Sequence, residues 1–183
     1  MNYELPTEIV IADKAYPIRR RGDYRVILDV LAAFEDPDLT EREQAAAALT
    51  IFYETLPTDL QRAAEEMVRF IDGGDGDERG KKSSARLMDW EQDFPLIVAP
   101  VNRILGCEIR ALPYLHWWSF LAAYMEIGDC TFSTVVSIRQ KKQKGKKLEK
   151  WEQDYAREHP DTVNLTPRVS QDEKDFLDSF VED

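Results

Sequence analysis

The residues that most often carry catalysis or bind metals are few and scattered in this sequence. The two histidines are His116, beside two tryptophans, and His159, before a proline, and the two cysteines are Cys107 and Cys130. Zinc sites need four closely spaced Cys, His or carboxylate ligands, and no CxxC or HxxxH pair occurs here. Cys107 and His116 could pair as nucleophile and base, but the favoured interpretation is a buried thiol and a histidine ring nitrogen bonded to a helix carbonyl. Without a secretory signal, both cysteines are expected to be reduced thiols of the core.

A glycine-rich, charged segment at residues 72–84 has some likeness to a phosphate-binding loop. A P-loop ends in Gly-Lys-Ser/Thr between a strand and a helix, whereas Gly80 and Lys81 are followed by Lys82 and no strand is expected before them. The acids of this segment also lack the spacing and the terminal glutamate of an EF-hand. The segment is therefore predicted to be a mobile loop. The chain is predicted not to be an enzyme and to use no metal and no cofactor.

The charges of the chain are unevenly distributed. The formal net charge is −11 over 183 residues, but residues 139–150 hold seven basic side chains and one acid. This basic segment therefore carries +6, and the other 171 residues carry −17. An acidic surface repels phosphate backbones and anionic lipids, so a general nucleic-acid or membrane-surface protein is disfavoured. No apolar run reaches the ~20 residues of a membrane span, and a cytosolic location is expected.

The basic segment is expected to lie on a long helix over residues 133–158. At 100° per residue, four basic side chains would share an arc of about 80°: Arg139, Lys142, Lys146 and Lys150. Leu148, Trp151 and Tyr155 would lie on roughly the opposite side, which predicts a cationic outer face and an aromatic inner face. Three interpretations remain open: a solvated face that balances nearby acids, a docking surface for an acidic protein segment, or a nucleic-acid site.

An aromatic cluster at residues 114–120 precedes this helix. The cluster contains two consecutive tryptophans, Trp117 and Trp118. On a helix their side chains would point about 100° apart, so they cannot both fill one narrow core stripe. Either this helix is central and buried nearly all round, or one of the two tryptophans faces a partner.

Apolar periodicity and capping signals predict a mainly α fold, a compact bundle of about six helices with a short N-terminal β-hairpin. Alternating apolar residues around Asp13 and Lys14 predict the hairpin. Asp23 is the expected N-cap of the first helix, Thr40 begins a capping box, and Thr58 begins a second capping signature. The helices are expected at residues 23–36, 40–56, 58–71, 89–105, 112–127 and 133–158.

Three further expectations concern packing and domain organisation. Pro95 and Pro100 are expected to kink or divide the fourth helix. Residues 1–160 are predicted to form a single helical domain, and residues 161–183 an acidic C-terminal tail. The third helix is expected to face inward with Leu60, Ala64, Met67, Val68 and Ile71.

Three sequence motifs resemble one protein family. They are LHWWSF at residues 115–120, CTFS at residues 130–133 and GKKL at residues 145–148, together with Ile138 and Arg139. The sequence resembles the bacteriophage "gene product fifteen" family, small proteins of tailed phages and prophages of Gram-positive bacteria. The resemblance covers roughly residues 1–160.

The resemblance implies a gene in the tail morphogenesis cluster, between the major tail protein and the tape measure. It implies a tail assembly chaperone of the host bacterial cytoplasm that binds the tape measure protein, or also the major tail protein, and that could form a homo-oligomer. The family carries no catalytic motif. The alternative is a small phage regulatory or nucleic-acid-associated protein acting through the basic helix at residues 139–150.

Six residues are expected to contact the partner. Trp117, Trp118 and Tyr124 are the expected aromatic anchors. The residues expected to steer an acidic partner are Arg139, Lys142 and Lys146.

Overall fold

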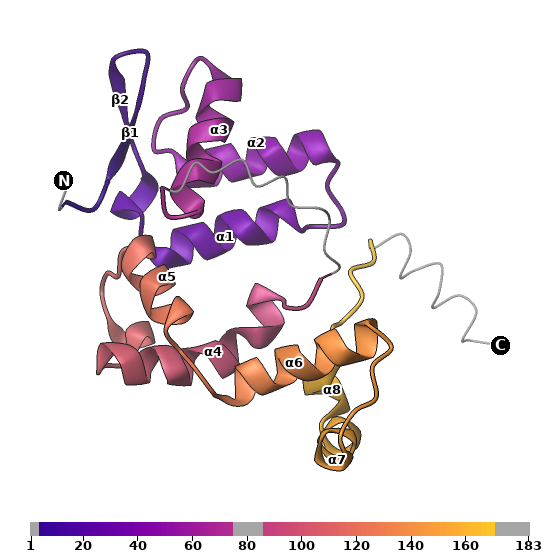
Figure 1. The fold of residues 1–183 in the computed structure, drawn as a ribbon. Helices are drawn as coiled ribbons and strands as arrows, with labels where there is room; N and C mark the ends of the chain where they lie inside the picture. The colour runs from indigo at the N-terminus through magenta and orange to yellow at the C-terminus, as the bar shows by residue number, and fades with distance from the viewer. Residues whose placement is uncertain (1–3, 75–85, 171–183) are drawn as a thin grey trace. The chain divides into compact units, whose positions relative to one another are not determined.

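The computed structural model describes residues 4–74 and 86–170, and within them it contains eight α-helices and one two-stranded hairpin (Figure 1). The mainly α fold with an N-terminal hairpin is confirmed, with eight helices where about six were expected. Most of the predicted mobile loop and of the predicted acidic tail lies outside the described residues. None of the described helices combines the length and the apolar character that crossing a membrane requires.

The contacts of the chain group into two compact units. Unit 1 comprises Met1–Gly74 with Pro167–Asp183, and unit 2 comprises Asp75–Thr166. The single domain expected at residues 1–160 stays a prediction.

The hairpin of unit 1 forms where the alternating apolar residues predicted it. Strand β1 (Glu8–Ile11) pairs antiparallel with β2 (Lys14–Pro17). Ala12 and Asp13 connect them, and both have positive φ angles, of 47° and 61°. This two-residue turn has the twist that neighbouring antiparallel strands favour. The hairpin directs Ile11 and Tyr16 into the core.

Three helices complete the described part of unit 1: α1 (Tyr24–Phe34), α2 (Glu41–Phe52) and α3 (Leu60–Ile71). Helices α1 and α2 pack against each other, and α3 contacts α2 and β1. The predicted N-cap Asp23 accepts a hydrogen bond from the Arg25 amide, and Thr40 forms the predicted capping box with Glu43. In the third helix Asp59, rather than Thr58, accepts the capping bond from the Arg62 amide.

The inward face of α3 differs from the prediction. Ala63, Met67 and Phe70 are buried, whereas Leu60 is 53% exposed and Val68 is 48% exposed. Aromatic residues at the end of α2 set this orientation. The Phe52 ring lies 5.4 Å from the Phe70 ring, and the Tyr53 hydroxyl donates a hydrogen bond to the Ala63 carbonyl. These contacts come from another helix, so the apolar period of α3 alone could not reveal them.

Five helices form unit 2: α4 (Trp90–Leu105), α5 (Trp117–Met125), α6 (Thr131–Gln143), α7 (Lys150–Glu158) and α8 (Pro160–Val163). Helix α4 packs against α5 and α6, and α8 packs against α6 and α7. Helix α4 continues through Pro95 and Pro100 without dividing. Helix α5 begins at Trp117, later than the predicted residue 112, because His116 is its N-cap.

The prediction of one long helix over residues 133–158 is wrong, because α6 ends at Gln143 and α7 begins at Lys150. Gly145 adopts a left-handed conformation with φ of 62°. The Lys146 amide donates to the Lys141 carbonyl at 2.9 Å, and the Gly145 amide donates to the Lys142 carbonyl at 3.1 Å. This pair of bonds is a Schellman motif, which ends a helix and satisfies its last carbonyls.

Replacing Gly145 tests this helix end. A side-chain Cβ at this position would meet no atom within 4 Å, so its cost comes only from the positive φ. We expect Gly145→Ala to lower the free energy of unfolding by about 1 kcal/mol and Gly145→Asn to lower it less. Urea unfolding measures both, with exposed Lys144→Ala as the control. Equal stability of Gly145→Ala and the wild type would contradict the left-handed helix end.

Candidate functional site

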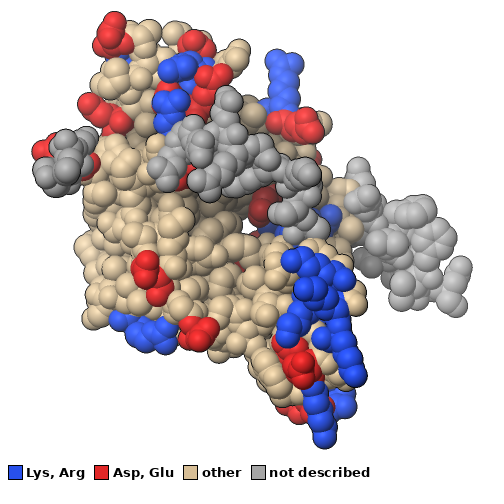
Figure 2. Space-filling view, in the orientation of Figure 1, with Lys and Arg blue, Asp and Glu red and all other residues tan. Residues whose placement is uncertain are grey.

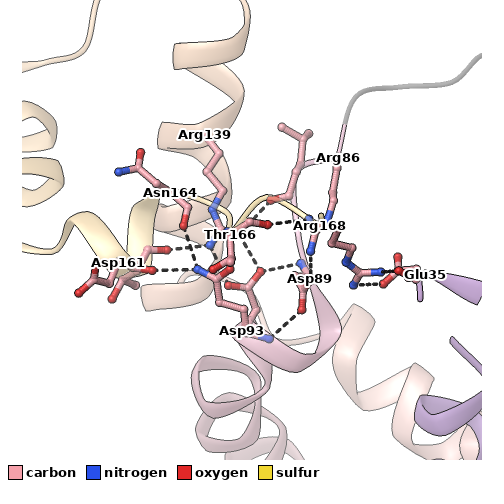
Figure 3. Close-up of polar contacts among 12 residues, drawn as sticks. Glu35, Arg86, Asp89, Asp93, Arg139, Asp161, Asn164, Thr166 and Arg168 are labelled. Atoms are coloured by element: carbon pink, nitrogen blue, oxygen red, sulfur yellow. Dashed lines mark hydrogen bonds and ion pairs between the residues drawn. The ribbon is translucent and has the colours of Figure 1, made fainter. Parts of the chain in front are cut away.

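Arg139 lies in the core of unit 2, only 6% exposed, and not on the cationic outer face where it was predicted. Its guanidinium forms a bidentate ion pair with Asp93 of α4, with N–O distances of 2.6 and 2.9 Å (Figure 3). The remaining N–H groups donate to the carbonyls of Leu87, Thr162 and Val163 at 3.1, 2.7 and 2.9 Å. All five guanidinium donors are therefore satisfied. We call this set of contacts the arginine clasp.

A second set of hydrogen bonds surrounds the arginine clasp. Asp93 also accepts a bond from the Asp89 amide at 3.0 Å. The Gln92 side chain donates to the carbonyls of Asp161 and Asn164 and accepts a bond from the Thr166 amide. The start of α4 is thereby fixed to α6 and to the segment 161–166. Asp89, Asp93 and Arg139 therefore have a structural role in unit 2.

The predicted aromatic anchors Trp117 and Tyr124 pack inside unit 2. Trp117 is 1% exposed, and its ring stacks on Phe120 with centroids 5.5 Å apart. Trp90 contacts both predicted anchors, at 6.0 Å from Trp117 and 5.1 Å from Tyr124. Burial raises the pKa of the Tyr124 hydroxyl. Trp117 is therefore a core residue, although α5 is not buried all round, because Ala122 and Met125 are exposed.

Trp118 and His116 mark the start of α5. Trp118 is half-buried, with its ring perpendicular to the His116 ring. His116 is buried, and its Nδ1 accepts a hydrogen bond from the Trp118 amide at 3.0 Å. The expected pair of core thiols is wrong, because Cys107 is exposed and Cys130 is half-buried. Among the described residues no cluster of His, Cys, Asp or Glu could hold a metal ion.

The basic segment divides into engaged and unpaired side chains. Arg139 belongs to the arginine clasp, Lys141 pairs with Glu152 at 2.6 Å, and Lys142 donates to the Asn164 side chain at 2.6 Å. Basic side chains gather over the end of α6 and over α7 in Figure 2. The exposed lysines of this segment that form no hydrogen bond or ion pair with another described side chain are Lys144, Lys146, Lys147 and Lys150. We call these four the lysine surface.

Trp151 lies next to the lysine surface and is 56% exposed. The predicted continuous helix had placed it on the inner face. The Schellman motif at Gly145 resets the phase of α7, so Glu152 occupies the buried position instead. The Lys141 ammonium, with the Glu149 amide, holds the pKa of the Glu152 carboxyl below its usual value. Trp151 is the surface aromatic that sequence reasoning missed, and the glycine within the lysine run was the available signal.

A second exposed feature lies on α3 in unit 1. Leu60, Ala64 and Val68 share an arc of about 80° on this helix, and we call them the α3 stripe. Gln61 and Glu65 border the stripe on its exposed side, and Glu65 forms an ion pair with Arg62 at 3.5 Å. An apolar stripe with neutralised borders is the surface that a partner helix packs against.

The arginine clasp, the lysine surface and the α3 stripe all lie within one family match. The family model of the bacteriophage Gp15 protein matches residues 1–165. No curated protein and no solved structure matches the chain.

Removing Arg139 tests the arginine clasp. Arg139→Met would leave the Asp93 carboxylate buried without its partner, so we expect a loss of about 3–5 kcal/mol in the free energy of unfolding. The double variant Arg139→Met/Asp93→Leu should recover part of this loss, because it leaves no unpaired buried charge. Urea unfolding measures each variant against exposed Lys146→Met. A single-variant loss as small as that of Lys146→Met would refute the clasp.

The two neighbouring tryptophans should differ in their effect on stability. Trp117→Ala opens a cavity in the core and should cost about 3–5 kcal/mol. Trp118→Ala should cost clearly less, because this side chain is only half-buried. Thermal unfolding followed by circular dichroism compares the two. Equal losses would mean that Trp118 packs as deeply as Trp117.

Proposed function

Because the chain belongs to the bacteriophage Gp15 protein family, and is therefore a phage protein, we propose that it is a tail assembly chaperone. In this proposal it is not an enzyme, and it binds the tape measure protein in the host cytoplasm during tail morphogenesis. The gene position that the family resemblance implies supports this assignment. The partner would be a long helical protein whose apolar stripes need cover until tail-tube subunits surround it.

The observation that carries the proposal is the α3 stripe. Leu60 and Val68 are each about half exposed, so covering them would contribute about 1 kcal/mol per side chain. The border of the stripe adds little cost, because Glu65, the charged residue beside it, already pairs with Arg62. Contact of this size favours a reversible complex. A chaperone needs such reversibility, because it must release the tape measure when the tube assembles.

The alternative function, nucleic-acid binding, would rest on the lysine surface. A nucleic-acid-associated protein would use its four unpaired lysines for phosphate contacts. Such binding should weaken with salt at a log–log slope of about −0.9 per contact. The other parts of the acidic chain would oppose a long polyanion, so we favour the chaperone.

Coexpression with the tape measure protein of the same phage tests the proposal. The wild-type chain should copurify with the tape measure and keep it soluble. Leu60→Gln/Val68→Gln should lose both effects, because polar groups in the α3 stripe would be desolvated on binding. Met125→Gln is the matched control, since Met125 is an exposed apolar side chain of unit 2. Both variants should keep the wild-type unfolding midpoint.

Two results would contradict the chaperone proposal. One is a tape measure protein that is soluble without the chain and forms no complex with it. The other is equal recovery of the tape measure with Leu60→Gln/Val68→Gln and with the wild type, which would remove the α3 stripe from the mechanism.

A further inference from the structure

The backbone that carries the lysine surface is held in place by contacts of other residues. Lys141 is fixed to buried Glu152, and Lys142 is fixed to Asn164. The Gln153 side chain donates to the Leu148 carbonyl at 2.7 Å, which anchors the start of α7. These bonds order the backbone from the end of α6 to α7. The exposed lysines therefore extend from a defined scaffold.

Among the described residues, the charge of this scaffold is only partly balanced. Lys144, Lys146, Lys147 and Lys150 carry four positive charges, and Glu149 supplies the one acid within that span. The nearby acids Glu152 and Asp154 are already paired, with Lys141 and Arg157 respectively. An uncompensated cationic cluster attracts a negatively charged ligand.

Trp151 adds an apolar group to the cationic cluster. It directly follows Lys150 in the first turn of α7 and is 56% exposed. Its neighbour Glu152 is the buried residue of this helix, so the indole lies outside the core of unit 2. Tryptophan is one of the residue types that dominate binding energy in protein interfaces.

We propose that the lysine surface and Trp151 together bind an acidic segment of a partner protein, with an apolar side chain of that segment covering the indole. The proposal rests on the proposed function for the identity of the partner, which would be a phage tail protein. It adds a second contact, on unit 2, to the α3 stripe on unit 1.

An acidic protein segment fits better than a nucleic acid. A short segment contacts only the cluster, whereas a long polyanion also meets the field of the other residues, which carry a strongly negative net charge. An apolar side chain beside the acids would also use the exposed indole, which a phosphate backbone alone would leave uncovered.

A synthetic peptide tests the proposal with the full-length chain. The probe is a labelled amphipathic helix with glutamates along one face and a leucine beside them, and its control carries glutamine in place of each glutamate. Fluorescence anisotropy at low salt should show binding of the glutamate peptide only. A labelled DNA duplex and a matching single strand are measured alongside.

Matched variants assign the binding to this surface. Lys146→Gln/Lys147→Gln should weaken binding of the glutamate peptide by about fivefold, as the loss of two exposed ion pairs implies. Lys14→Gln/Arg42→Gln changes the net charge equally at exposed sites of unit 1 and should leave binding within about twofold. Trp151→Ala should weaken binding of the glutamate peptide by about tenfold. Tyr114→Ala, at an exposed aromatic residue elsewhere, should leave peptide binding unchanged.

Four results would overturn the proposal. They are equal binding of the glutamine peptide, equal effects of the two double variants, unchanged binding by Trp151→Ala, and tighter binding of either DNA probe than of the peptide. Self-association of the chain that Lys146→Gln/Lys147→Gln abolishes would also overturn it, since a second copy would then be the occupant. Peptide binding without tape measure binding would contradict only the chaperone proposal, because the peptide assay does not involve the α3 stripe.

Discussion

A buried guanidinium needs an acceptor for each of its donors, and this requirement organises unit 2. Arg139 meets it with Asp93 and with three backbone carbonyls, at residues 87, 162 and 163. Those acceptors come from segments that are far apart in sequence, so the pair fixes the start of α4 and the segment after α7 against α6. The next turn of α6 then places Lys142 against Asn164. The position of the lysine surface therefore depends on an ion pair in the core.

The features that the sequence predicted well are those that depend on nearby residues. The hairpin follows from alternating side chains around a two-residue turn. The caps at Asp23 and Thr40 follow from single polar side chains that accept from the amides of Arg25 and Glu43. The predictions fail where contacts between residues far apart in sequence determine the structure. Phe52 and Tyr53 orient α3, and Asp93 draws Arg139 into the core, although Arg139 is 46 residues away. The break at Gly145 was a local signal, but the run of lysines around it favoured a continuous helix.

The candidate interaction surfaces differ in the physical force that each would use. The α3 stripe offers exposed apolar area, so it suits contact that depends little on salt. The lysine surface offers unpaired charge beside one indole, and it suits fast, salt-dependent encounter.

The coupling between Arg139 and Asp93 has a consequence for how relatives of this chain can diverge. Either residue alone is a buried, unpaired charge, so a lineage that loses one of them passes through a destabilised intermediate. The two positions should therefore change together or not at all. No such coupling ties the exposed lysines to the core, and a charge lost at one can be regained at its neighbour. Partner preference can thus drift in small steps while the scaffold beneath it stays the same.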